Sequence, residues 1–176
     1  MPQYFSNFPK IYYDAVGNDD YKVVTHLLRR VQIKKGLLEI GSVFDEMNLS
    51  THSTPEIVSE QMYGTQDYYW VVLLVNNIKD RFYDWPLTEE QFEKFVNDKY
   101  ANPNAVHHYE ITQTSGPTSS IDDSHKIQVN STTPNSTAIT NYEYERRIQD
   151  KKARIRVLRP EYLELFVEEF KSLMEV

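Results

Sequence analysis

Residues 54–86 read TPEIVSEQMYGTQDYYWVVLLVNNIKDRFYDWP, and this stretch decides the fold. Thr54 followed by Pro55 predicts a helix start. The threonine hydroxyl can accept a hydrogen bond from an unpaired backbone N–H, and proline at the first helical position gives up a donor that has no partner there. Gly64 predicts the end of this helix, because glycine readily adopts the left-handed conformation of a C-terminal cap. We therefore expect a helix over residues 55–63.

A second helix is expected at once. Thr65 or Asp67 can cap it, and residues 68–75 (YYWVVLLV) are apolar without interruption. A helix that is apolar on all sides is buried on most of them. A β-strand is the competing interpretation, because the run is short and contains three valines. The cap signals before the run and Asn76-Asn77 after it favour the helix. The run is far shorter than the ~20 residues that cross a bilayer.

Several motifs in and around this stretch form a recognisable pattern. They are PE (55–56), YG (63–64), YYWVVLLVNN (68–77) and DWPLT (84–88), with YFSNFPKIYYD (4–14), NYEYERRI (141–148) and RVLRPEYLELFVEEF (156–170) in the flanks. The combination resembles the baseplate wedge protein of contractile-tailed phages, of the gene-53 type. More loosely, it is similar to the LysM fold, in which two short helices stand between two strands. The positions that match the LysM skeleton are Ile57, Val58, Tyr63, Gly64, Leu73 and Asn76 or Asn77.

The wedge resemblance implies a structural protein of the virion, located in the tail baseplate and assembled in the host cytoplasm. Its expected partners are other baseplate wedge proteins, in several copies around a ring, and its expected role is to join wedge to wedge around the hub. The LysM resemblance implies an alternative, a module that binds peptidoglycan or chitin in a groove between residues 51–54 and 76–86. The lack of a signal peptide and of tandem repeats weighs against this alternative.

Composition narrows the functional classes. The formal net charge is −7 and the pI is about 5.2, whereas nucleic-acid-binding proteins present a basic face. The sequence has no cysteine, and its N-terminus lacks the features of a signal peptide. It contains no phosphate-binding glycine loop and no catalytic motif with the required spacing. We therefore expect a protein that is not an enzyme, holds no cofactor or metal, and binds neither nucleic acid nor membrane.

Further elements follow from periodicity and turn signals. We expect an extended aromatic arm over residues 1–20, helices over 21–29, from Thr88 to near Asn102, and from Pro160 onward, and a loop over 78–86. Strands are expected over 31–34, 43–49, 106–111, 126–129 and 153–158. Residues 142–148 are interpreted as a strand or a strand-to-helix entry. Residues 112–140 are rich in polar and turn-forming types, which predicts a long excursion that is mobile in isolation.

The fold class expected is α+β. A small LysM-like β-α-α-β core carries the aromatic N-terminal arm, additional strands and a C-terminal amphipathic helix. The expected segments are residues 1–36 (arm with helix and strand), 37–103 (LysM-like core with the following helix) and 104–176 (strand region, polar excursion over 112–140 and C-terminal helix).

Two polar features invite a functional reading. His107 and His108 are adjacent, but neighbouring residues of a strand point to opposite faces, so we expect them not to share a metal ion. Basic residues cluster between positions 146 and 159, and we expect the acidic residues of the C-terminal helix to compensate them. An acidic partner or a nucleic acid stays open as the alternative.

Large aromatic side chains are the candidates for partner binding, because such side chains dominate protein interfaces. The arm either packs on its own domain or reaches a neighbouring subunit. Trp85 either anchors its own loop, contacts a partner, or stacks on a glycan. The candidate partner-binding residues are Phe5, Phe8, Tyr12, Tyr69, Trp70, Phe82, Tyr83, Trp85, Phe166 and Phe170.

Overall fold

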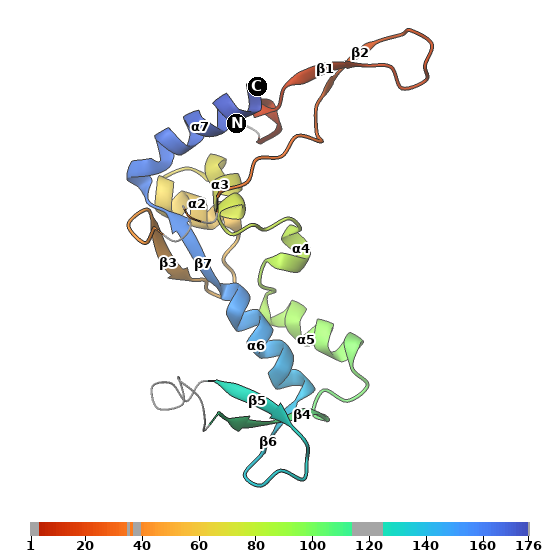
Figure 1. Cartoon of the computed structure of the whole chain (residues 1–176), viewed down its shortest axis with the longest axis vertical. Helices are drawn as coiled ribbons and strands as arrows, with labels where there is room; N and C mark the ends of the chain where they lie inside the picture. The colour runs from red at the N-terminus through yellow and green to blue at the C-terminus, as the bar shows by residue number, and fades with distance from the viewer. Residues whose placement is uncertain (1–3, 35, 37–39, 114–124, 176) are drawn as a thin grey trace. The chain divides into compact units, whose positions relative to one another are not determined.

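The structure is a computed structural model that describes residues 4–34, 36, 40–113 and 125–175. Figure 1 shows helices together with small sheets, which confirms the α+β class. The chain divides into two compact units, Met1–Trp85 with Arg154–Val176 (unit 1) and Pro86–Ala153 (unit 2). The three segments expected from the sequence divide the chain in another way, since each is one continuous stretch and unit 1 is not. That division stays a prediction.

The elements of unit 1 alternate short helices and short strands. In chain order they are η1 (Tyr4–Asn7), β1 (Lys10–Tyr13), β2 (Lys22–Thr25), β3 (Phe44–Asn48), α2 (Pro55–Tyr63), η2 (Gln66–Tyr68), α3 (Tyr69–Val75), α4 (Arg81–Asp84), β7 (Arg154–Leu158), η3 (Pro160–Tyr162) and α7 (Leu163–Glu175). Unit 2 contains α5 (Glu89–Lys99), β4 (Val106–Thr112), β5 (Lys126–Val129), β6 (Thr137–Thr140) and α6 (Asn141–Ala153).

The two helices predicted from residues 54–76 are confirmed. The Thr54 side chain accepts a hydrogen bond from the backbone N–H of Ile57 at the start of α2, and Gly64 ends the helix in the left-handed conformation with φ 71°. Thr65 then caps the short turn η2, which leads into α3. Trp70, Val71, Val72 and Val75 of α3 are buried, which explains why this run is apolar on all sides.

Strands β3 and β7 pair antiparallel, with Phe44 opposite Leu158 and Asn48 opposite Arg154. Unit 1 therefore contains the expected order of strand, two helices and strand, but the second strand comes from residues 154–158, and the whole of unit 2 is inserted before it. The more specific likeness to the LysM fold stays a prediction.

Two side chains from the helical stretch hold β7 in place. The Asn76 amide donates to the carbonyl oxygen of Arg156 and accepts from the N–H of the same residue, at 2.8 Å in each case. The Tyr63 hydroxyl donates to the carbonyl oxygen of Leu158 at 3.0 Å. Because these groups point away from β3, the two side chains act in place of a neighbouring strand along that edge.

Two hydrophobic clusters fill unit 1. In the first, α3 and α7 meet the N-terminal segment, and its buried members are Phe8, Phe44, Trp70, Val71, Val75, Leu158, Leu163, Phe170 and Met174. The second lies between the helices and the sheet, with Val58, Val72, Trp85, Ile155 and Val157 buried. The amphipathic stripe predicted for the terminal helix supplies much of the first cluster, although Leu173 stays 46% exposed.

The predicted helix over 21–29 and strand over 31–34 are wrong. Residues 22–25 form β2, which pairs antiparallel with β1, and residues 31–34 have no regular structure. The Asp14 carboxylate accepts hydrogen bonds from the backbone N–H groups of Val16, Gly17 and Asp19, so it organises the turn that brings the two strands together. The pairing of β1 with β2 therefore determines the conformation of residues 22–25, although the apolar residues of this stretch have helical spacing.

Unit 2 joins two helices to a three-stranded antiparallel sheet in the order β5-β4-β6. A capping box at Thr88 and Gln91 opens α5 as predicted, and the helix ends at Lys99, before the expected stop near Asn102. The strand β5 is confirmed, whereas β6 was not foreseen within the polar excursion. Residues 114–124 of that excursion lie outside the described residues. Residues 142–148 are helical, so the strand interpretation is wrong there.

Candidate interaction surfaces

The structure separates the ten candidate partner-binding residues by exposure. Phe8, Trp70, Trp85 and Phe170 are buried, and Tyr69 and Phe166 are partly buried against the first cluster. Phe5, Tyr12, Phe82 and Tyr83 are exposed, by 56%, 77%, 81% and 76% respectively. A partner could reach the four buried side chains only if the core opened. The exposed four are the ones available for contact.

The first part of the aromatic arm packs on its own unit. Tyr4 lies 5.7 Å from Trp70 and 5.9 Å from Phe170 between ring centroids, and Phe8 contacts the ring of Tyr4 edge-on at 4.9 Å. The pKa of Tyr4 is raised, first by burial and then by the neighbouring Tyr69, while Arg30 opposes the rise. Tyr4 and Phe8 of the arm therefore pack on their own unit, whereas Phe5 and the hairpin that follows are exposed. Contact of the arm with a neighbouring subunit stays a prediction.

The hairpin β1–β2 exposes apolar side chains along its length. It is a two-stranded ribbon without a buried residue, and such ribbons are marginally stable in water by themselves. No third strand among the described residues pairs with it, so both of its edges are available for further pairing. Its exposed apolar residues, together with those that follow β2, are Tyr12, Tyr13, Val16, Tyr21, Val23, Val24, Leu27 and Leu28.

The helix α4 is held at both ends but turns its aromatic side chains outward. The expected loop over 78–86 in fact contains this helix, because Asp80 caps it by accepting from the N–H of Phe82 at 2.8 Å. At its start, Arg81 forms a two-pronged ion pair with Glu56 of α2, with 3.0 Å between Nη2 and Oε2. At its end, the buried Trp85 donates from Nε1 to the carbonyl oxygen of Ser53 at 2.8 Å. Trp85 thus anchors its own segment, and Phe82 and Tyr83 stand exposed between two fixed points.

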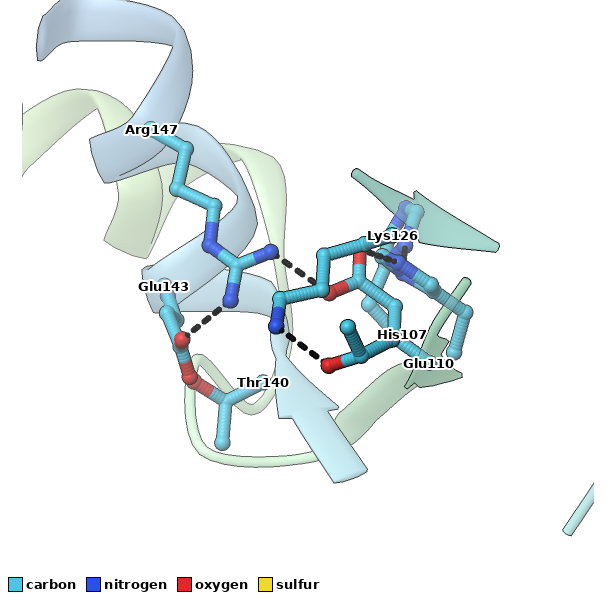
Figure 2. A network of polar contacts seen from close by, with 8 residues as sticks. His107, Glu110, Lys126, Thr140, Glu143 and Arg147 are labelled. Atoms are coloured by element: carbon cyan, nitrogen blue, oxygen red, sulfur yellow. Dashed lines mark hydrogen bonds and ion pairs between the residues drawn. The ribbon is translucent and has the colours of Figure 1, made fainter. Parts of the chain in front are cut away.

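Unit 2 contains a polar network between β4 and α6 (Figure 2). Arg147 donates to Glu110 and to Glu143 at 2.7 Å each, and His108 Nε2 lies 2.7 Å from Glu110 Oε1. The pKa of Glu110 is lowered: burial alone would raise it, and the hydrogen bonds from Arg147 and His108 more than offset that. The network ties the helix to the sheet, and each of its acidic groups has a basic neighbour.

The expectation that His107 and His108 point to opposite faces is wrong. Their Nδ1 atoms lie 2.8 Å apart, and the His107 ring stacks on Tyr144 at 4.0 Å. The cause is an irregularity in the pairing of β4 with β6 between Val106 and His108, since a bulge interrupts the alternation of a strand. Within the described part of the chain, no three His, Cys, Asp or Glu side chains converge as metal ligands would.

A second charged pair fixes α5 to α6. Glu145 is only 3% exposed, and it accepts hydrogen bonds from Lys99 Nζ and the Tyr100 hydroxyl at 2.7 Å each. Burial would raise the pKa of Glu145, but the bonds from Lys99 and Tyr100 lower it below its ordinary value. Nearby, the buried Gln149 accepts from the N–H of Leu87 at 3.0 Å. The buried side chains of Glu145 and Gln149 therefore both have hydrogen-bond partners, and we assign these contacts a structural role.

Acidic residues of the same chain compensate part of the basic cluster, and the contribution expected from the acidic residues of α7 stays a prediction. Arg146 forms an ion pair with Glu89, Arg147 with Glu110 and Glu143, and Arg159 with Asp45.

In the described residues, no helix is both long and apolar enough to span a membrane.

Sequence reasoning missed two groups of residues. The role of Asn76 as a clamp on β7 depends on a strand some eighty residues away, so no local signal identifies it. The exposed apolar residues in and after β2, such as Val23 and Leu28, were hidden by the helix expected over 21–29. The available signal was a pair of short runs of β-branched and aromatic residues, 11–13 and 23–25, with turn-forming residues between them.

Comparison with known proteins identifies the family. Residues 5–115 match the family model described as base plate wedge protein 53 of phages. No curated protein matches the chain significantly. The matched residues contain the helical stretch 54–86, whereas the resemblance of residues 141–148 and 156–170 lies beyond them and stays a prediction. Since the match spans well over half of the 176 residues, the chain belongs to the phage base plate wedge protein 53 family, with a structural role in the baseplate of a viral tail.

Proposed function

We propose that this protein joins baseplate wedges to one another around the hub by protein–protein contacts, and that unit 1 presents the principal contact surface. The observation that carries the proposal is the pair Phe82 and Tyr83 on α4. Two large aromatic side chains lie 81% and 76% exposed on a segment that the Glu56–Arg81 ion pair and buried Trp85 hold in place. A partner that covers them gains apolar contact area without the entropic cost of ordering the helix.

The hairpin β1–β2 supports the same role. Its exposed valines and tyrosines and its two open edges suit a segment that gains stability when a partner strand or apolar surface covers it. The partners we propose are other wedge proteins, in several copies around a ring in the virion, assembled in the host cytoplasm. Nucleic acid, membrane and catalysis have no part in this proposal.

Purified chain mixed with purified wedge proteins of the same phage tests the proposal, with complex formation followed by size-exclusion chromatography and titration. The wild-type chain should co-elute with at least one wedge protein. Replacing Phe82 and Tyr83 by alanine should weaken that complex by roughly 30-fold or more, because truncating a central aromatic residue commonly costs about 2 kcal/mol or more.

The matched control is Leu165→Ala, which removes an apolar side chain that is 66% exposed on α7. This variant should bind as the wild type does. If the wild-type chain remained monomeric with every wedge protein, the proposed function would be wrong. If the α4 variant and the control bound equally well, the contact surface would have to lie elsewhere.

A further inference from the structure

A groove of about 430 Å³ opens on unit 1 between the N-terminal segment and α3. Residues of η1 and of the segment after β2 form one side, and the outward side of α3 with the residues that follow it forms the other. The groove is lined by both apolar and basic residues, among them Phe5, Trp70, Leu27, Arg29, Arg30 and Lys79.

The charge of this groove is opposite to that of the chain. Arg29, Arg30 and Lys79 line it, and none of the described residues that line it is Asp or Glu, although the chain carries a net charge of −7. None of the three forms a salt bridge with a described residue. Arg29 donates from Nη2 to the carbonyl oxygen of Leu173 at 3.1 Å, so it helps to hold α7. The side chains of Arg30 and Lys79 are exposed and make no hydrogen bond to a residue that the structure describes.

The groove also presents apolar side chains to a ligand. Trp70 contributes to its wall from the core, and the rim carries Phe5 and Leu27, which are 56% and 61% exposed. An apolar side chain placed against this rim would shield Phe5 and Leu27 from water, and burial of apolar surface favours association. Guanidinium and ammonium groups beside an apolar site favour a ligand that combines carboxylates with apolar side chains.

We propose that this groove binds an acidic segment of another baseplate protein, with carboxylates on Arg30 and Lys79 and an apolar side chain against Phe5 and Leu27. The proposal rests on the proposed docking role of unit 1 and states the chemistry of one partner. A nucleic acid fits less well, because its charges follow one another along a phosphate backbone, and the chain as a whole would repel it. An acidic peptide spaces its carboxylates with side chains that suit the apolar rim.

The test uses two fluorescein-labelled synthetic peptides and the full-length chain. In one peptide glutamate alternates with phenylalanine and leucine, and in the other glutamine replaces every glutamate. Fluorescence anisotropy at low ionic strength should show the acidic peptide binding at least 10-fold more tightly, and added salt should reduce the difference. The double variant Arg30→Glu and Lys79→Glu should lose that preference.

The control carries the same change of charge away from the groove. Lys94→Glu with Lys171→Glu reverses two exposed lysines on α5 and α7, and it should retain the preference for the acidic peptide. Absence of peptide binding, equal binding of both peptides, or a preference that survives in the groove variant would each overturn the proposal. Co-elution with wedge proteins is measured separately, so a chain that forms the complex but fails the peptide test would refute the groove and leave the proposed function standing.

Discussion

Replacing Asn76 by alanine should loosen β7 without disturbing unit 2. The Asn76 side chain makes two hydrogen bonds of 2.8 Å to the backbone of Arg156, and a third of 2.8 Å to the carbonyl oxygen of Val72. A typical intramolecular hydrogen bond contributes about 0.5–1.5 kcal/mol net, so losing the two to β7 should cost about 1–3 kcal/mol. Water can reach this edge because Arg156 is exposed, which favours the lower half of that range.

Hydrogen exchange of the Arg156 backbone amide measures this cost directly. A loss of 1–3 kcal/mol corresponds to exchange that is roughly 5- to 150-fold faster. Asn76→Asp should be at least as damaging at neutral pH. Its carboxylate can still accept from the Arg156 N–H, but it places a second oxygen against the Arg156 carbonyl.

The matched control is Asn97→Ala on the exposed side of α5, which should leave exchange at Arg156 unchanged. If Arg156 exchanged at the wild-type rate in Asn76→Ala, the clamp would contribute nothing, and the idea that side chains of the helical stretch close this edge of the sheet would be refuted.

Further predictions concern caps, pH and the anchor of α4. Gly64→Ala should lower the stability of unit 1 by about 1 kcal/mol in thermal unfolding followed by tryptophan fluorescence. The cause is the positive φ of 71°, which residues with a Cβ rarely adopt, and not a clash, since no atom lies within 4 Å of an added Cβ. An unchanged unfolding transition would refute this. Thr88→Ala should destabilise unit 2 by about 0.5–2 kcal/mol, seen as faster exchange at the start of α5, with Thr88→Ser as the control that restores it. The pKa of Glu145 is lowered, so its ion pair with Lys99 stabilises unit 2 above pH ~4.5. That contribution should be lost as the pH falls through the lowered pKa, and Lys99→Met should flatten the acid dependence of exchange in α6. Trp85→Phe removes the 2.8 Å bond to Ser53, and it should cost about 1–3 kcal/mol and increase exchange in α4; unchanged exchange would show that Trp85 does not anchor the helix.

Local signals in the sequence were sufficient to predict helix ends that are fixed by capping residues. The caps at Thr54, Gly64 and Thr88 act within one turn of helix, and all three occur where the sequence predicted them. The strand at residues 154–158 was also foreseen from alternation, but its pairing with β3 was not, because α2, η2, α3, α4 and the whole of unit 2 separate the partner strands in the sequence.

The errors have specific physical causes. Residues 21–29 have helical spacing, yet the turn organised by Asp14 pairs β2 with β1 and settles the conformation. The two histidines meet because of a bulge, which depends on the register with β6. For the candidate surface, residue type alone could not separate Phe82 from Trp85. Both are large aromatic residues in one short segment, and only burial distinguishes the proposed contact residue from the anchor.

Hydrogen exchange of the chain, free and within an assembled wedge complex, tests the central claim most directly. We expect slower exchange in the complex at residues 10–25 and 81–84, with little change in the buried helix α3. Protection confined to other parts of the chain, with the hairpin β1–β2 and α4 exchanging as fast as in the free protein, would contradict the proposal that these exposed apolar surfaces hold the wedges together.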